Sequence, residues 1–287
     1  MSSRVEPRTW RMTVNGIRTP VREVGPGDDR EAVVFLHGNP GSGADWLGLL
    51  GRVGGFSRAV AWDAPGFGQA DKPSDFPQDV DNHAAFVAAA LDQLGIERAH
   101  LVLHDFGGLW GLAWAATDAA RFASVVLADT GLLVDYRWHR LARIWQTPGL
   151  GELFMAATTG PAFRALLRQG NPRGLPRDFT DRMYDDFDRG TRAAVLRLYR
   201  SAIDIGTPSR RLSAALRPLN RPALVLWGAH DPYLPKTLAR QQRETFPDAE
   251  VVVLDRSGHW PFVDDPDRCG DLVAGFLRRV RTTDPRP

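Results

Sequence analysis

Three residues, each placed directly after a predicted strand, carry side chains that could do chemistry together: Asp105, Asp231 and His259. Asp105 lies between the apolar run 99–103 and a helix-like segment that opens with two glycines. A carboxylate at such a turn faces a helix N-terminus, where backbone N–H groups and the helix dipole favour an anion. Asp105 is therefore predicted to be an ionised nucleophile. The alternative is that it only caps the helix, as aspartate often does.

The partners of Asp105 come later in the chain, in the order acid and then base. Asp231 follows the predicted strand 222–227, and His259 follows the strand near 249–255. The carboxyl ends of parallel strands share one edge of a sheet, so these side chains are expected to meet there. Asp129, at the end of the predicted strand 122–129, is the alternative acid.

An aspartate nucleophile indicates a particular reaction. A carboxylate is already charged at neutral pH, so it needs no base to activate it, and it can displace a leaving group from a saturated carbon. The resulting alkyl-enzyme ester would be hydrolysed by water that His259 deprotonates. The backbone N–H groups of Asn39 and Phe106 are predicted to form the oxyanion hole. Hydrolysis at an electrophilic carbon is therefore favoured over acyl transfer.

The elements that must position these residues alternate along the chain. Residues 7–24 read as a hairpin turning at Asn15-Gly16, and strands then alternate with helices, which predicts an α/β fold with a mostly parallel sheet covered on both faces. From about Gly131 to Pro218 the pattern contains helices only. We therefore expect a core domain of residues 1–130 and 219–287 and a helical cap domain of residues 131–218.

The chain resembles α/β-hydrolases of the aspartate-nucleophile branch, which contains epoxide hydrolases, haloalkane dehalogenases and β-lactone-processing enzymes. The resemblance covers roughly residues 20 to 280 and implies an eight-stranded sheet with an inserted cap. It departs from the G-x-S-x-G elbow at Leu103 and at the nucleophile itself. The motifs that carry it are HGNP (37–40), DAPGFGQADKP (63–73), HDFGG (104–108), WGAHDP (227–232) and SGHWPF (257–262).

The resemblance implies one of two main leaving groups, an epoxide oxygen or a halide. Epoxide hydrolases use cap tyrosines to protonate the ring oxygen, and Tyr199 stands at one such place. The second place has no tyrosine, only Leu141 nearby, so another cap side chain would have to substitute. The candidates for that substitution are Tyr136, His139 and Tyr184.

Haloalkane dehalogenases share Asn39, whose side-chain amide can donate to a halide, but they usually have a tryptophan where this chain has Phe106. A phenylalanine supplies no N–H, so a halide would lose one donor. Epoxide hydrolysis is therefore favoured, with dehalogenation next and β-lactone processing third. A further alternative is a non-catalytic receptor with a hydrolase fold, although it would have no need of an intact nucleophile, acid and base.

Three more side chains are expected to assist the site. Trp260, directly after the predicted base, should contact substrate. His37 and His104 are expected to support the oxyanion loop and the nucleophile turn by hydrogen bonding. Neither histidine has a metal-ligand spacing, and we expect no metal or other cofactor.

Composition agrees with a globular enzyme that acts on a small molecule and water. The chain has 287 residues, 43% of them hydrophobic, and a formal net charge of +2. No nucleic-acid-binding module, signal peptide or membrane-length apolar run is evident. A single cysteine, Cys269, suits a reducing compartment, so a cytoplasmic monomer or homodimer is expected. The tail 281–287 is predicted to be disordered.

Overall fold

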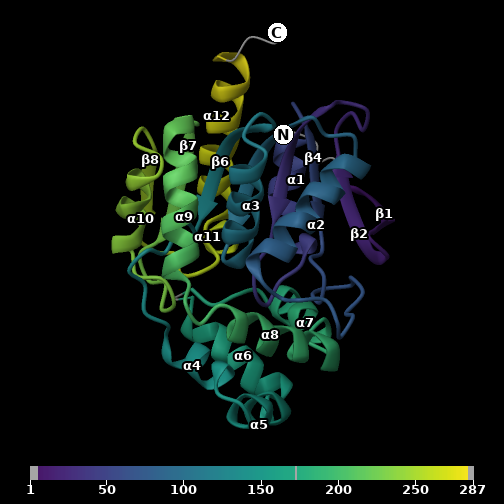
Figure 1. Cartoon of the computed structure of the whole chain (residues 1–287), viewed down its shortest axis with the longest axis vertical. Helices are drawn as coiled ribbons and strands as arrows, with labels where there is room; N and C mark the ends of the chain where they lie inside the picture. Colours follow the sequence, from purple (N-terminus) through teal and green to yellow (C-terminus); the bar gives the residue numbers. More distant parts are fainter. Residues whose placement is uncertain (1–5, 172, 284–287) are drawn as a thin grey trace.

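The computed structural model describes residues 6–171 and 173–283, and these contain one eight-stranded sheet (Figure 1). The strand order is β1-β2-β4-β3-β5-β6-β7-β8, and every pairing is parallel except β1 with β2 and β2 with β4. The predicted fold class is confirmed. The strands are β1 (Arg8–Val14), β2 (Ile17–Val24), β3 (Glu31–Leu36), β4 (Arg58–Trp62), β5 (Arg98–His104), β6 (Phe122–Ala128), β7 (Ala223–Gly228) and β8 (Glu250–Leu254).

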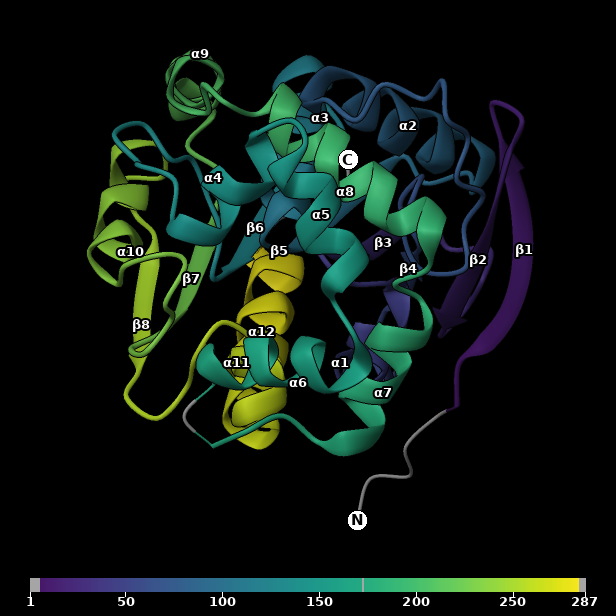
Figure 2. The ribbon, with the colours of Figure 1, turned by 90° about the horizontal axis from the view of Figure 1, so that it is seen from below.

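Helices cover both faces of this sheet, which explains why its central strands are continuous apolar runs. Figure 2 shows α2, α3 and α9 on one face and α1 and α12 on the other. The predicted hairpin turn is also present, because Asn15 and Gly16 both have positive φ angles, of 50° and 80°. These helices are α1 (Leu47–Val53), α2 (Val80–Gln93), α3 (Phe106–Thr117), α9 (Gly206–Leu216) and α12 (Pro266–Thr283).

Five helices between β6 and β7 gather beyond the carboxyl ends of the strands, below the sheet in Figure 1. The sixth helix of this insertion, α9, packs along α3 beside the sheet instead. The helices that cover the strand ends are α4 (Arg140–Gln146), α5 (Leu150–Ala157), α6 (Gly160–Gln169), α7 (Arg177–Asp185) and α8 (Arg189–Ser201). We call these five helices the cap.

Charged pairs tie the cap to the core. Arg182 of α7 donates to the buried carboxylate of Asp45 at 2.6 Å, and Lys72 pairs with Asp188 at 3.0 Å. Asp45 belongs to the short 3-10 helix η1 (Gly43–Trp46), which directly follows the HGNP loop. The cap therefore docks on the same loop that carries the predicted oxyanion donor.

The C-terminal helix continues further than expected. Residues 281–283, which were predicted to be disordered, complete α12, and residues 284–287 lie outside the described residues. Arg281 pairs with Glu31 at 3.0 Å, so an ion pair to the first residue of β3 holds this last turn. In the described ranges, none of the helices has the length and apolar character needed to cross a membrane.

One glycine is required where α3 passes the end of β3. A Cβ at Gly107 would lie 2.5 Å from the backbone carbonyl oxygens of both Leu36 and His37, which cannot move as a flexible side chain could. We expect Gly107→Ala to lower the free energy of unfolding by ~1–3 kcal/mol, the usual range for overpacking, measured by urea denaturation. Gly48→Ala is the matched control, because Gly48 is also helical and a Cβ there meets nothing within 4 Å. Equal stability of the two variants would contradict this account.

Candidate active site

Asp105 occupies the sharp turn that joins β5 to α3. Its backbone angles, φ 49° and ψ −127°, are rare for a residue with a side chain and cost of order 1–3 kcal/mol. Neighbouring groups hold the turn: Thr130 donates its hydroxyl proton to the Asp105 carbonyl oxygen, close against Gly108. The Asp105 side chain makes no capping hydrogen bond to α3. The carboxylate therefore points away from the helix and into the pocket.

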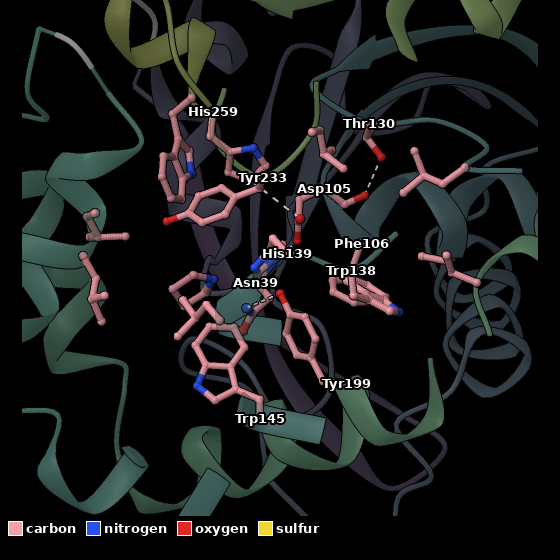
Figure 3. A pocket seen from close by; sticks show the side chains of 18 of the residues that line it. Asn39, Asp105, Phe106, Thr130, Trp138, His139, Trp145, Tyr199, Tyr233 and His259 are labelled. Atoms are coloured by element: carbon pink, nitrogen blue, oxygen red, sulfur yellow. Dashed lines mark hydrogen bonds and ion pairs between the residues drawn. The ribbon is translucent and has the colours of Figure 1, made fainter. Parts of the chain in front are cut away.

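The structure brings the predicted acid and base to this carboxylate, and Figure 3 shows the base, His259, beside Asp105. His259 Nδ1 lies 2.7 Å from Asp231 Oδ2, and His259 Nε2 lies 3.6 Å from Asp105 Oδ2. The other Asp231 oxygen accepts the backbone N–H groups of Tyr233 and Leu234 at 2.7 and 3.0 Å. One carboxylate oxygen of Asp231 is thus held by the backbone, and the other contacts the imidazole of His259.

The charges of Asp105 and His259 stabilise each other. Burial by itself raises the pKa of Asp105, but the hydrogen bond and charge of His259 outweigh burial and leave this pKa below the usual carboxyl range. Burial by itself lowers the pKa of His259, and the two carboxylates of Asp231 and Asp105 reverse the shift and raise it well above its usual value. At neutral pH the resting site therefore holds an ionised Asp105 beside a protonated His259.

The loop after β3 supplies a backbone donor to the nucleophile. The N–H of Asn39 donates to Asp105 Oδ1 at 2.7 Å. His37 holds this loop, because its Nδ1–H donates to the Gly38 carbonyl at 2.8 Å while its Nε2 accepts the Ala64 N–H at 2.9 Å. Phe106 is the first residue of α3, and the role of its N–H as second oxyanion donor stays a prediction.

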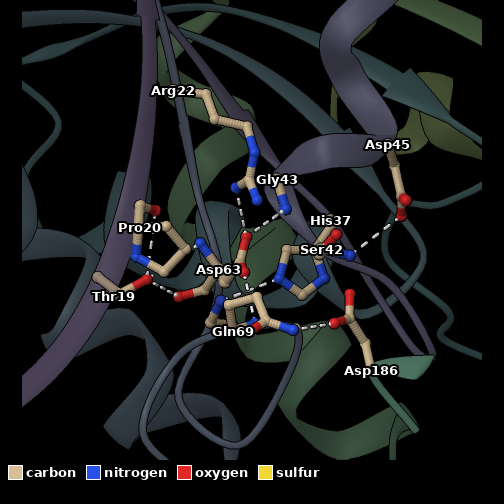
Figure 4. Close-up of polar contacts among 12 residues, drawn as sticks. Thr19, Pro20, Arg22, His37, Ser42, Gly43, Asp45, Asp63, Gln69 and Asp186 are labelled. Carbon is tan, nitrogen blue, oxygen red and sulfur yellow. Dashed lines mark hydrogen bonds and ion pairs between the residues drawn. The ribbon is translucent and has the colours of Figure 1, made fainter. Parts of the chain in front are cut away.

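A buried carboxylate fixes the same loop from behind (Figure 4). Asp63, directly after β4, accepts the backbone N–H groups of Gly43 and Gln69 at 2.8 and 2.7 Å. It also accepts a hydrogen bond of 2.7 Å from the guanidinium of Arg22 on β2. Asp63, the first residue of the DAPGFGQADKP motif, therefore has a structural role that its sequence position did not indicate.

His104 has a different partner from the one expected. Its Nε2 lies 2.8 Å from the backbone carbonyl oxygen of His259, so it connects the end of β5 to the loop that carries the base, rather than supporting the turn alone. Burial lowers the pKa of His104 to about 3, which keeps the ring neutral. A neutral imidazole with its proton on Nε2 is the form that can donate to this carbonyl.

A pocket of about 870 Å³ lies between the cap and the strand ends. Its lining is mostly aromatic and aliphatic, and Asp105 and His259 are the ionised groups in it; no lysine, arginine or glutamate lines it within the described ranges. The site therefore suits an uncharged, apolar substrate.

Tyr199 of α8 brings a hydroxyl to the nucleophile. Its oxygen accepts a long hydrogen bond of 3.4 Å from the Asn39 side-chain amide, and Figure 3 shows it turned toward Asn39 and Asp105. Burial raises the pKa of Tyr199 well above its usual value, and the nearby Asp105 carboxylate raises it further. The phenol therefore keeps its proton.

The three substitutes considered for a second cap donor lie in different places. Tyr184 packs against Phe163 and is not among the lining residues, and Tyr136 donates its hydroxyl to the Tyr233 carbonyl at 2.8 Å. His139 lines the pocket, and its Nδ1 accepts the N–H of Ala142 at 3.1 Å as the N-cap of α4.

The pocket lining includes residues that the sequence indicated and residues that it did not. The residues Leu141, Tyr233, Trp145 and Trp260 all line the pocket, and of these the sequence indicated only Trp260 as a substrate contact. Tyr233 could have been noticed because it lies two residues after Asp231, in the turn that orients the acid. Trp145 had no comparable signal, because its position depends on how α4 packs against α8.

Phe106 lacks a donor, and Trp138, which stacks on it, does not supply one in its place. Its ring lies parallel to that of Trp138, with 6.0 Å between centroids. The Trp138 indole N–H is already donated to the Ala202 carbonyl at 2.8 Å. The indole N–H of Trp145, which also lines the pocket, has no partner among the described residues. Within the described part of the chain, no group of three or more His, Cys, Asp or Glu side chains is arranged to hold a metal ion.

Comparisons with known proteins show which enzymes this chain is similar to. A cis-3-alkyl-4-alkyloxetan-2-one decarboxylase from Xanthomonas campestris is 27% identical over 92% of this chain and 93% of its own length. The crystal structure of haloalkane dehalogenase DbeA from Bradyrhizobium elkani superposes with a TM-score of 0.86, at 25% identity over 97% of this chain and all of that one. The epoxide hydrolase CorEH, at 18% identity, has a similar fold, with a TM-score of 0.81 over 96% of this chain and 100% of that one.

The profile of the family described as alpha/beta hydrolase fold matches residues 31–266, a range that contains β3 to β8, the cap and all three residues of the Asp105–His259–Asp231 arrangement. The chain belongs to the α/β-hydrolase fold family.

Proposed function

We propose that this hydrolase opens epoxides through an alkyl ester on Asp105. The observation that carries the proposal is the phenol of Tyr199. Its oxygen accepts a hydrogen bond from Asn39, and within the described residues its own proton is donated to no protein acceptor. A buried phenol with a raised pKa, facing a carboxylate nucleophile across an apolar pocket, can give that proton to the oxygen of an opening ring.

In the first step Asp105 Oδ2 attacks one ring carbon of the epoxide. The carbon–oxygen bond of the ring breaks, and the oxygen takes the proton of Tyr199. The products of this step are an alkyl ester on Asp105, a new hydroxyl group on the substrate and a Tyr199 phenolate. Asp105 Oδ1 becomes the ester carbonyl oxygen, and it already accepts the Asn39 N–H at 2.7 Å.

In the second step His259 takes a proton from water, whose oxygen attacks the ester carbonyl carbon. The Asn39 N–H, with that of Phe106, stabilises the tetrahedral oxyanion. Collapse breaks the acyl–oxygen bond; the leaving oxygen takes the proton from His259, and a diol is released. The Asp105 carboxylic acid then gives its proton to His259, which restores the resting site of ionised Asp105, protonated His259 and neutral Tyr199.

Ester formation also prepares the base. In the resting site the charge of Asp105 helps to keep His259 protonated. The ester is neutral, so this contribution disappears, the pKa of His259 falls, and His259 gives up its resting proton to the Tyr199 phenolate. The neutral imidazole can then accept a proton from water. The first step therefore activates the second.

His139 can supply a second hydrogen bond to the ring oxygen. Its Nδ1 accepts the N–H of Ala142, so the neutral ring carries its proton on Nε2. Burial lowers the pKa of His139 to about 4, which keeps it neutral at physiological pH. A neutral N–H donor orients the oxygen and leaves proton transfer to Tyr199.

Dehalogenation is a second candidate because of one observation. The Asn39 side-chain amide faces the pocket beside the nucleophile, and its only hydrogen bond within the described residues is the long one to Tyr199. It could therefore donate to a departing halide. The missing N–H at Phe106 counts against this reaction, at a cost of about 1–3 kcal/mol for a buried anion deprived of one donor.

A substrate panel tests the proposal. Purified protein is incubated with a terminal aryl epoxide, a 1-bromoalkane of similar length and a disubstituted β-lactone, and product formation is measured. The epoxide is expected to give a diol at the highest kcat/KM. A higher kcat/KM for the bromoalkane or the lactone would overturn the proposal in favour of that reaction.

Substitution of the nucleophile and substitution of the base should block different steps of the reaction. We expect Asp105→Ala to abolish turnover, whereas His259→Gln should form the ester once and then stop, because the ester lacks a base for its hydrolysis. Intact-mass spectrometry should show His259→Gln heavier by one whole epoxide and Asp105→Ala unchanged. Steady-state activity in Asp105→Ala close to that of the wild type would rule out this mechanism.

Tyr199 distinguishes the two leaving groups. Tyr199→Phe should slow ester formation from an epoxide by ~10²-fold or more, the effect of losing a general acid, in rapid-quench single turnovers. Esterification by a bromoalkane should change little, since a halide leaves without a proton. Tyr184→Phe is the matched control, because Tyr184 lies in the cap outside the pocket lining. Undiminished epoxide opening in Tyr199→Phe would remove the support for the epoxide reaction.

A further inference from the structure

A second aspartate lies beside the acid of the triad. Asp129 directly follows β6, the strand next to β7, whose end carries Asp231. The side chain of Asp129 is fully buried, with 0% exposure, and both of its oxygens face the backbone N–H of Gly228, at 2.9 and 3.2 Å. The carbonyl oxygen of the same Gly228 accepts the backbone N–H of Asp231 at 3.4 Å, so Asp129 lies against the turn that carries Asp231.

The two carboxyl groups have unequal surroundings. Asp231 receives two backbone N–H groups and the imidazole of His259. Asp129 receives the one N–H of Gly228, and within the described ranges it forms no ion pair with a lysine, arginine or histidine. The titratable groups around Asp129 are Asp231 and His259 at the strand ends and the Cys269 thiol of α12.

Two adjacent buried carboxylates cannot both stay ionised, because their repulsion adds to the cost of burying each charge. One proton must therefore be kept between them. The negative charge belongs on Asp231, which has three donors, and the proton on Asp129, which has one. In agreement, burial raises the pKa of Asp129 well above the usual carboxyl range, and the charge of Asp231 raises it further.

We propose that Asp129 is a neutral carboxylic acid that donates its O–H to the Asp231 carboxylate, so that the acid of the triad is a pair of aspartates sharing one negative charge. This inference rests on the proposed Asp105–His259–Asp231 hydrolysis. Asp129 is then a positioning residue, which acts on His259 through Asp231. It also limits the charge beside His259, because two negative charges would hold the imidazole protonated and leave it a poor base for the ester.

The proton on Asp129 can be observed directly. Infrared difference spectra of wild type minus Asp129→Asn, at neutral pH, should show the carbonyl stretch of a protonated carboxylic acid, shifted in D₂O. No substrate is needed, so this measurement is independent of whether the epoxide reaction is correct. Absence of that band would overturn the proposal.

Activity gives the second test. Asp129→Asn replaces the O–H donor by an N–H donor and keeps an oxygen for the Gly228 N–H, and asparagine tolerates the φ of 44° at this position. Its rate of ester hydrolysis should stay within about threefold of wild type, whereas Asp129→Ala should lose ~10- to 100-fold, as for a lost hydrogen bond to a charged group. Ester formation should be unchanged in both variants.

Other outcomes are equally decisive. A loss of several orders of magnitude in Asp129→Asn would show that the charge of Asp129 is needed, and equal rates in the Asn and Ala variants would show that its hydrogen bond is not. Asp231→Asn serves as comparison, with an expected loss of ~10³- to 10⁴-fold for removal of the orienting acid. If Asp129→Ala fails to fold, the infrared band and the rate of Asp129→Asn still decide.

Discussion

The site depends on keeping one carboxylate charged inside an apolar pocket. Moving an ion of this size out of water costs several kcal/mol even after the protein relaxes around it. Groups next to the carboxylate must therefore stabilise its charge. Asp105 receives this stabilisation from the Asn39 N–H and from the charge of His259. The strand-end geometry of this sheet brings both groups to one side chain.

Under the proposed mechanism the same groups also do chemistry, so the groups that stabilise the charge of Asp105 are those that assist the reaction. The charge that stabilises Asp105 at rest resides on His259, and in that mechanism it is no longer needed once Asp105 is esterified. The donor that stabilises the ionised Oδ1 is also placed for the oxyanion that forms on that atom. The cap increases both effects, because excluding water strengthens each electrostatic interaction inside the site.

The sequence could predict the features that depend on a short stretch of residues, but not those that depend on tertiary contacts. The positions of Asp105, Asp231 and His259 depend on strand ends, and the apolar runs before them made those ends visible. The choice between Asp129 and Asp231 depends on which side chain reaches the imidazole, and that is a matter of loop geometry. Both residues follow adjacent parallel strands, so no spacing along the chain could separate them.

The cap was the least predictable part, because its pocket-facing residues are set by packing between helices that are distant in sequence. Trp145 contacts Tyr199, which is more than fifty positions later, with 4.7 Å between ring centroids. Similarly, His104 reaches the carbonyl of His259 across the sheet edge. A helical repeat predicts that a face is buried, but it does not predict which partner covers it.

The donors facing the nucleophile differ in one property that bears on the reaction class. An amide N–H, like that of Asn39, can only share its proton, which is enough for a halide because a halide leaves as a stable anion. An alkoxide is far more basic and needs a proton as the bond breaks, and a phenol such as Tyr199 can transfer one. Phenylalanine at position 106 provides no side-chain N–H that could donate to a halide. Tyr199, beside Asp105, provides a phenol proton that can be transferred to an alkoxide. The balance of donors in this pocket therefore favours an oxygen leaving group over a halide.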